Sequence, residues 1–181
     1  MHGLNRSFPA MWRCSATWVF TLATAAALGI SAAAAPAQVT DDMLKHVGGI
    51  RTLKSLHLTG CDIDDRKLSQ LKALTELEFL ELGGTQVSDA GLQHLTGMKT
   101  LDEVHLSNTN VSGSNLTALE GLKRLRVLRL GGPNFTDISA ALASLKMMPS
   151  LRRLQLIQVE LNDEARQDIR IALPDCKIQY L

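Results

Sequence analysis

Residues 79–95, FLELGGTQVSDAGLQHL, change from a strand-like to a helix-like spacing of apolar residues without any linker. Near the start, Leu80 and Leu82 alternate with other residues, which puts both leucines on one face of a short strand. Near the end, Leu92 and Leu95 are three positions apart, which is typical of one side of a helix. The stretch therefore predicts a strand–turn–helix unit, which is too small to bury its own leucines.

The same unit recurs along the chain at a nearly constant interval. Leu53, Leu77, Leu101 and Leu125 occupy every 24th position, and Leu151 follows after a slightly longer interval. From each of these leucines the chain follows, with few departures, the pattern L-x-x-L-x-L-x-x-(C/T)-x-(V/I/L). Five such units predict a solenoid in which neighbouring repeats stack and bury one continuous core.

This pattern resembles that of the leucine-rich repeat proteins. The second half of the unit, TQVSDAGLQHL, is similar to the cysteine-containing subclass and to repeats of exported bacterial proteins. The resemblance implies a right-handed α/β solenoid, with a parallel β-sheet on the concave face and helices on the convex face. It also implies recognition of a protein or peptide through the concave sheet.

The repeats divide the chain into consecutive segments. We predict a leucine-rich repeat domain at 38–181, made of an N-terminal half-repeat cap at 38–50 and units at 51–74, 75–98, 99–122, 123–148 and 149–181. The last unit includes a C-terminal cap, whose apolar stripe faces away from charged residues. Polar pairs precede the helical halves, and we expect them to cap the helices: 64–65, 88–89, 136–137 and 162–163.

Residues 1–37 have the features of a signal peptide. No acidic residue occurs before Asp41, two arginines supply positive charge, and residues 18–35 are uncharged and rich in alanine. Ala35 and Ala37 are small residues at the positions that a signal peptidase reads, which predicts cleavage after Ala37. We therefore expect an exported protein, located in the periplasm, the cell envelope or the extracellular space.

An uncleaved membrane anchor is the alternative interpretation of this segment. Its apolar stretch is close to the lower limit of about 18 residues for spanning a bilayer, although alanine makes it only weakly hydrophobic. The sequence also leaves open whether translation starts at Met1 or at Met11.

Thr85 and the cysteines have structural interpretations. Thr85 aligns with Cys61 and Thr109, a position that in the resembling family turns inward and satisfies backbone groups where the strand ends. Cys14 lies in the predicted signal peptide. Cys61 and Cys176 are separated by about four stacking steps of ~4.8 Å, which exceeds the ~7 Å that a disulfide allows between Cα atoms. We therefore expect these two cysteines to be free and mostly buried.

The alternate positions of the strands point out of the concave face and supply the candidate binding residues. Phe79 and Val127 would offer apolar contact, and aromatic and arginine side chains are the usual anchors of protein interfaces. The predicted partner-binding residues are His57, Phe79, Glu81, Glu103, His105, Val127, Arg129 and Arg153.

Charge changes sign along the repeats. Residues 38–122 contain 7 Lys and Arg against 12 Asp and Glu, a net of −5, whereas residues 123–181 contain 10 against 6, a net of +4. One interpretation is a docking surface of two signs. The other is an internal ladder of ordinary surface ion pairs, for example between Asp102 and Arg126.

Several functional classes lack support in the sequence. It contains no nucleophile–base set, no phosphate-binding glycine loop and no basic–aromatic strip, and its formal net charge is only +1. His57, Glu81 and His105 could meet at a divalent metal such as zinc, but side chains that stand parallel favour ordinary polar residues. We predict a monomer that is not an enzyme and uses no metal or cofactor. A membrane-tethered structural scaffold of the cell envelope and a carbohydrate-binding module are the alternative functions.

Overall fold

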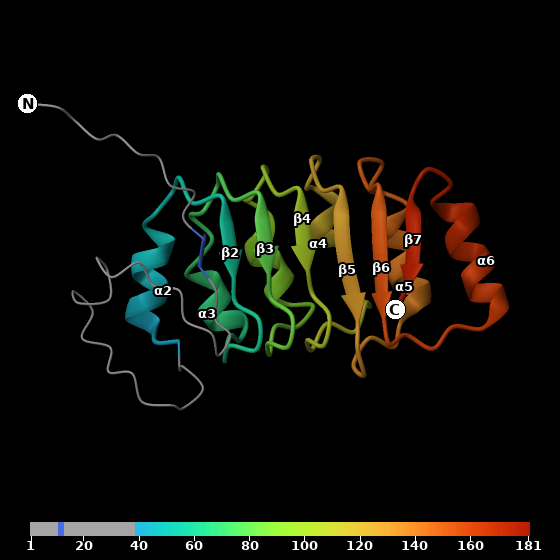
Figure 1. The fold of residues 1–181 in the computed structure, drawn as a ribbon, viewed down its shortest axis with the longest axis horizontal. Helices are drawn as coiled ribbons and strands as arrows, with labels where there is room; N and C mark the ends of the chain where they lie inside the picture. Colours follow the sequence, from blue (N-terminus) through green and yellow to red (C-terminus); the bar gives the residue numbers. More distant parts are fainter. Residues whose placement is uncertain (1–10, 13–38) are drawn as a thin grey trace, which may run out of the picture.

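A computed structural model gives the fold of the chain and describes residues 11–12 and 39–181. The predicted cleavage site, after residue 37, lies outside the described residues. The centre of the fold is a parallel sheet of seven strands that follow one another in chain order (Figure 1). The strands are β1 (Met11–Trp12), β2 (Ser55–His57), β3 (Phe79–Glu81), β4 (Glu103–His105), β5 (Val127–Gly131), β6 (Arg153–Ile157) and β7 (Lys177–Tyr180).

The strands pair in a register that aligns equivalent repeat positions. Ser55 pairs with Phe79, Phe79 with Glu103, and Glu103 with Val127, so each partner lies one repeat further along the chain. The step from β5 to β6, where Val127 pairs with Arg153, is longer and matches the longer interval before Leu151. Between two outward-facing positions, each strand from β2 to β6 carries one apolar residue that points into the core. Leu80 of β3, for example, is completely buried.

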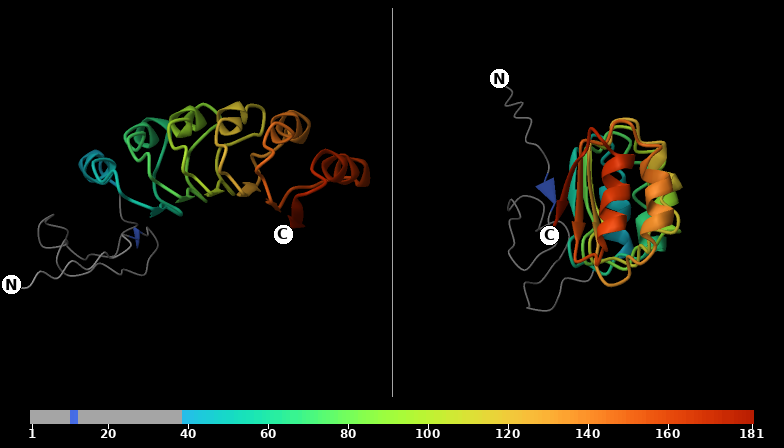
Figure 2. Two further views of the ribbon diagram at one scale, coloured as in Figure 1. Left: turned by 90° about the horizontal axis from the view of Figure 1, so that it is seen from above. Right: turned by 90° about the vertical axis from the view of Figure 1, so that its right-hand side faces the viewer.

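The helices lie on one side of the sheet, and the molecule forms an arc with the sheet on the inner side and the helices on the outer side (Figure 2). The predicted α/β solenoid is therefore confirmed. Its helices are α2 (Asp41–Gly48), α3 (Asp65–Ser69), the 3-10 helix η1 (Gly91–Leu95), α4 (Thr117–Glu120), α5 (Ile138–Leu145) and α6 (Asp163–Ala172).

The predicted helix caps are correct in three of four repeats. Side chains of Asp64, Asp137 and Asn162 accept hydrogen bonds from first-turn N–H groups of α3, α5 and α6. The second repeat differs, because η1 begins after Ala90 and no side chain caps it. A 3-10 helix fits here because its residues at i and i+3, such as Leu92 and Leu95, fall on one side.

Ser88 and Asp89, the pair wrongly predicted to cap that helix, connect neighbouring repeats instead. The N–H and hydroxyl of Ser88 donate to the Asp65 carboxylate at 2.8 and 2.6 Å. In the same way, the N–H and hydroxyl of Ser112 donate to the Asp89 carboxylate at 2.9 and 2.7 Å. Each aspartate therefore binds the serine of the next repeat, and its oxygens are not available to cap its own helix.

The threonine at the strand end has the structural role that was predicted. Thr85 and Thr109 are buried, and their hydroxyls donate to the carbonyl oxygens of Leu82 and Leu106 at 2.7 and 2.8 Å. Each threonine satisfies a backbone acceptor inside the turn.

The prediction for the two cysteines is correct for one of them. Cys176 is free and half-buried, and it does not bond to Cys61. Cys61 is disulfide-bonded, so the prediction that both are free is wrong. The number of stacked repeats between Cys61 and Cys176 excludes only a bond between these two residues.

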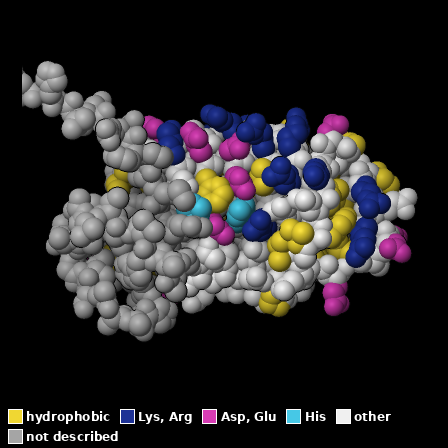
Figure 3. All heavy atoms as spheres, in the orientation of Figure 1, with side chains coloured by type: hydrophobic (Ala, Val, Ile, Leu, Met, Phe, Trp, Pro, Cys, Tyr) yellow, Lys and Arg dark blue, Asp and Glu magenta, His cyan; other side chains and the backbone are white. Residues whose placement is uncertain are grey.

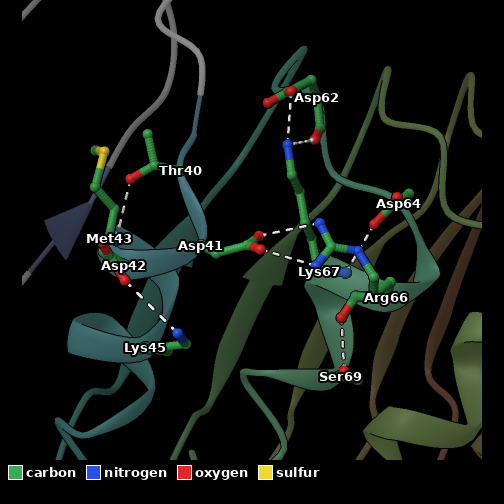
Figure 4. A network of polar contacts seen from close by, with 10 residues as sticks. All are labelled: Thr40, Asp41, Asp42, Met43, Lys45, Asp62, Asp64, Arg66, Lys67 and Ser69. Atoms are coloured by element: carbon green, nitrogen blue, oxygen red, sulfur yellow. Dashed lines mark hydrogen bonds and ion pairs between the residues drawn. The ribbon is translucent and has the colours of Figure 1, made fainter.

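The N-terminal helix is attached to the first repeat by charged contacts (Figure 4). The carboxylate of Asp41, in α2, contacts the guanidinium of Arg66, in α3, at 2.8 and 3.2 Å. Asp62 accepts hydrogen bonds from the Lys67 amine at 2.6 Å and from the Val39 N–H at 3.1 Å. These contacts join α2 to the repeat that follows it.

The other end of the core is closed by α6. Ile169 and Leu173 at this helix are buried, and the helix ends before Pro174. The charged residues on its other side are all exposed: Glu164, Arg166, Asp168 and Arg170. This arrangement is that of the predicted C-terminal cap with a polar outer face.

Candidate functional site

The concave face of the sheet is the side that no described helix covers (Figure 2). Side chains of alternate strand positions stand on this face in two rows, one for each register position. The first row contains His57, Glu81, His105 and Arg129, and the second contains Phe79, Glu103, Val127 and Arg153. The structure therefore brings all eight predicted residues onto one surface.

Two histidines flank Glu81 in the first row. Nδ1 of His57 lies 3.2 Å from one oxygen of Glu81, and Nδ1 of His105 lies 3.7 Å from the other. Nε2 of His57 lies 3.2 Å from the Ser55 hydroxyl and Nε2 of His105 lies 2.6 Å from Glu103 Oε1, whereas the buried Nδ1 of His105 has no hydrogen-bond partner among the described residues. One polar network thus spans β2, β3 and β4.

The network holds Glu81 in its charged form. Burial raises the pKa of Glu81, but hydrogen bonds from His57 and Thr59 and the charges of His105 and His57 together lower it by more. The net pKa of Glu81 is therefore below its usual value, as expected for a carboxylate that accepts hydrogen bonds and faces positive charge.

Phe79 lies between the same two histidines and is half-buried. Its ring centroid is 4.6 Å from that of His57 and 5.2 Å from that of His105, in the second case at 78°, an edge-to-face arrangement. Such contacts fix an aromatic ring at the surface. Phe79 is therefore an ordered apolar residue between polar side chains, and Figure 3 shows hydrophobic side chains next to histidine and acidic ones on this face.

His105 is the only one of the eight predicted residues that is buried, with 7% of its surface exposed. Its ring contacts Glu81, Glu103 and Phe79. His105 therefore orients the neighbouring side chains, and little of its own ring is exposed to a partner.

The acidic residues of the concave face are all engaged with partners from the same sheet. Glu81 and Glu103 contact the two histidines, and Asp102 forms an ion pair with Arg126. At the edge of the face, the Lys54 amine lies 3.3 Å from Glu78 and 3.2 Å from Glu76. The acidic residues therefore form an internal ladder of ion pairs and hydrogen bonds, as in the second interpretation of the charge pattern.

The basic residues of the face are engaged differently. Arg129 Nε donates to the neutral amide oxygen of Gln155 at 2.9 Å. Arg152 donates to two backbone carbonyl oxygens. The side chain of Arg153 has no hydrogen bond or ion pair within the part of the chain that the structure describes, although its backbone N–H donates to the Arg126 carbonyl oxygen. Positive charge consequently remains uncompensated over β5 and β6 (Figure 3).

Two further residues, Lys177 and Gln179, extend these rows to β7, and the sequence analysis missed them as members of the face. Lys177 pairs in register with Arg153, and Gln179 pairs with Gln155 and accepts a hydrogen bond from its amide at 2.8 Å. The repeat period could have identified both, because Lys177 and Gln179 follow Arg153 and Gln155 by that interval. Gln155, on β6, links the two strands, because its side-chain oxygen accepts the hydrogen bond from Arg129.

Within residues 11–12 and 39–181, no three histidine, cysteine, aspartate or glutamate side chains are arranged to hold a metal ion. The ring nitrogens of His57 are both used in contacts with protein oxygens. Among the described helices, none has the length and apolar character needed to cross a membrane.

The fold has counterparts among solved structures. An internalin, InlF, of Listeria monocytogenes has a TM-score of 0.50 and 19% sequence identity, over 76% of this chain and 44% of that one. A leucine-rich repeat protein of Leptospira interrogans has a TM-score of 0.45 and 18% sequence identity, over 75% of this chain and 45% of that one. A plant peptide hormone receptor, RGFR1, in complex with RGF2 has a TM-score of 0.29 and 12% sequence identity, over 75% of this chain and 37% of that one.

No protein-family model and no curated protein matches the sequence. The chain spans less than half the length of the similar structures, 44% and 45% for the first two. At this level of identity, the likeness concerns the fold alone.

Proposed function

We propose that this chain, which has the leucine-rich repeat fold, is a binding module that recognises a protein or peptide partner through its concave sheet. The observation that supports this most directly is the face of the sheet that no described helix covers, on which Phe79 and Val127 share a row with charged residues. Parallel sheets are usually covered by helices on both faces, so a face that no described helix covers can present a row of side chains to other molecules.

The side chains of this face are held in place before any partner arrives. Contacts between neighbouring strands fix His57, Glu81 and Phe79, and a second set fixes Arg129, Gln155 and Gln179. Side chains that are already ordered lose less entropy on binding, which favours affinity. The face therefore combines exposure with order, as a recognition surface requires.

We also propose that the protein is exported and is not an enzyme. The signal-peptide pattern of residues 1–37 supports export, and the absence of a nucleophile–base set from the sequence supports a role in binding. N-terminal sequencing of the protein from its native cell tests export. A first residue of Gln38 agrees with cleavage, whereas an intact N-terminus favours the membrane-tethered scaffold.

Capture of partners from the native cell envelope tests the proposed function. The test variant combines Phe79→Ala with Arg129→Gln on the concave face. The matched control combines Lys72→Gln, in the turn after α3, with Ile171→Ala on α6, since Ile171 is 70% exposed. Both variants are first compared with the wild type by thermal melting.

We expect the control to recover the same partner as the wild type and the concave-face variant to lose it. The affinity of the purified partner then measures the loss, which we expect to exceed about 2 kcal/mol because interface anchors of this type often cost that much. Equal affinity of both variants would refute binding through the concave face.

A further inference from the structure

We infer that the partner docks through an acidic protein segment, which lies over β5, β6 and β7 at one end of the concave face. This inference rests on the proposed function and gives the chemistry of the partner. We call this surface the basic band. It consists of Arg129, Arg153 and Lys177 on β5, β6 and β7, and of Arg124, Arg126 and Arg152, which line one hollow.

The first support is the lack of internal compensation. Arg126 is the only member of the basic band that forms an ion pair with an acid among the described residues, through Asp102. Arg129 contacts a neutral glutamine, and Arg152 contacts only carbonyl oxygens. The side chains of Arg124, Arg153 and Lys177 have no polar contact in the described part of the chain. Five of the six charges thus remain available.

The second support is the register of the sheet. Arg153 and Lys177 are directly paired on β6 and β7. Arg126 and Arg152 also occupy equivalent positions, where the Arg152 N–H donates to the Arg126 carbonyl oxygen at 2.8 Å. Like charges directly opposite each other on neighbouring strands destabilise a sheet. Arg126 is compensated by Asp102, so the repulsion that an anionic partner would relieve is chiefly that between Arg153 and Lys177.

The third support is the shape of the surface beside the band. A hollow of about 280 Å³ is lined by Asp102, Lys123, Arg124, Arg126, Ser150 and Arg152. Guanidinium groups form paired, charge-assisted hydrogen bonds with carboxylates. Asp102 in this hollow is already paired with Arg126, so a glutamate or aspartate side chain that enters it can pair with the guanidinium groups of Arg124 and Arg152.

The neighbouring strands favour a short acidic segment over a long polyanion such as nucleic acid. A chain of phosphates that continued along the concave face from β5 to β3 would meet Glu103 and Glu81. It would also meet Glu78 at the edge, and like charges are repelled there. The anionic part of the partner is therefore limited to β5–β7.

Two synthetic peptides test the inference with the full chain. One alternates glutamate with alanine, the other alternates lysine with alanine, and both are about eight residues long, enough to cross three strands about 4.8 Å apart. Each carries a fluorescent label, and binding is measured by anisotropy at low salt and at about 0.15 M salt. We expect the glutamate peptide to bind, the lysine peptide not to bind, and salt to weaken the binding.

Arg153→Glu provides a variant whose effects on binding and stability have opposite signs. It places a carboxylate opposite Lys177, so the melting temperature should rise, whereas affinity for the glutamate peptide should fall about tenfold or more. A general loss of folding cannot produce this combination. The control Lys72→Glu makes the same change of charge away from the basic band and should leave the affinity unchanged.

Three results would overturn the inference: equal binding of the two peptides, unchanged affinity of Arg153→Glu, or displacement of the glutamate peptide by inorganic phosphate at an equal concentration of anionic groups. The last result would indicate a site for small anions. If the native partner still requires Phe79 and Arg129 while the glutamate peptide fails to bind, the proposed function stands and the acidic partner is wrong.

Discussion

His57 and Glu81 are joined across neighbouring strands, with Nδ1 of the histidine 3.2 Å from Oε2 of the glutamate. The two residues lie at equivalent positions of successive repeats and pair in register. Part of the charge on the concave face therefore stabilises the sheet itself. Under the proposed function, the charges that stabilise the sheet and the charges offered to a partner belong to different residues of the same surface.

The lowered pKa of Glu81 predicts a contribution to stability that depends on pH. For a carboxyl group with a depressed pKa, this contribution is fully present above the ordinary value of 4.5 and is lost as the pH falls through the folded-state pKa. Glu81→Gln should lower the free energy of unfolding at neutral pH by about 1.5–3 kcal/mol. It should also flatten the loss of stability below pH 4.5. Urea unfolding across this range checks both effects, and parallel curves for variant and wild type would contradict them.

The link between Asp65 and the next repeat predicts coupling between two distant positions of the sequence. A Cβ atom on Gly91 would lie 2.1 Å from Oδ1 of Asp65, so the missing side chain makes room for the carboxylate. Asp65→Ala leaves the Ser88 N–H without its acceptor and should cost about 1–3 kcal/mol. Gly91→Ala should be costly in the wild type and much less so together with Asp65→Ala. Additive costs in a double-mutant cycle would show that the two positions are independent.

Thr85 predicts a measurable cost for the loss of one hydroxyl. Thr85→Val keeps the shape of the side chain but removes the donor to the Leu82 carbonyl oxygen. We expect about 1–3 kcal/mol of destabilisation, because the site is buried. Thr96→Val is the matched control, since its hydroxyl also donates to a carbonyl oxygen, that of Gln93, but at an exposed site. Chemical denaturation measures the free energy of unfolding of both variants. An equal loss in the two would argue against a special role for Thr85.

The charged contacts of α2 predict local loosening of the N-terminal cap. A hydrogen bond from Arg66 lowers the pKa of Asp41, and one from Lys67 lowers the pKa of Asp62. Both carboxyl groups therefore keep these contacts above their ordinary value of 3.8 and lose them as the pH falls below it. Arg66→Gln should increase hydrogen exchange at Leu44 and Val47 of α2 while β5 and β6 remain protected. Unchanged exchange in α2 would show that these contacts do not hold the helix.

The sequence allowed the fold to be predicted because the spacing of leucines reports the stacking directly. A leucine that recurs once in every repeat can be buried only if successive units pair in the same register, and Leu80 and Leu82 are indeed completely buried. The same register predicted that residues such as Phe79 and Arg129 share one face. The fold was predictable because the buried apolar residues recur with the repeat period, and this period can be read from the sequence.

Contacts between polar side chains were harder to predict, because they depend on rotamers and not on the period. Ser88 and Asp89 have the pattern of a helix cap, yet neighbouring repeats offered them better partners. The sequence also did not decide whether the side chains of His57 and His105 turn toward solvent or toward Glu81. In the structure, both turn toward Glu81. The disulfide of Cys61 was missed because Cys14 was assigned to the predicted signal peptide and Cys176 is too far away in the stack.

Site-specific photo-crosslinking in the native cell tests most directly whether the concave face meets a partner. A photoreactive amino acid replaces Val127 on the concave face in one protein and Ile171 on α6 in the other. Both positions are accessible, so each protein can report contact with a neighbour. We predict a discrete adduct with another protein from position 127 and none from position 171. An adduct from position 171 alone would contradict the account and place the binding surface on the helical side.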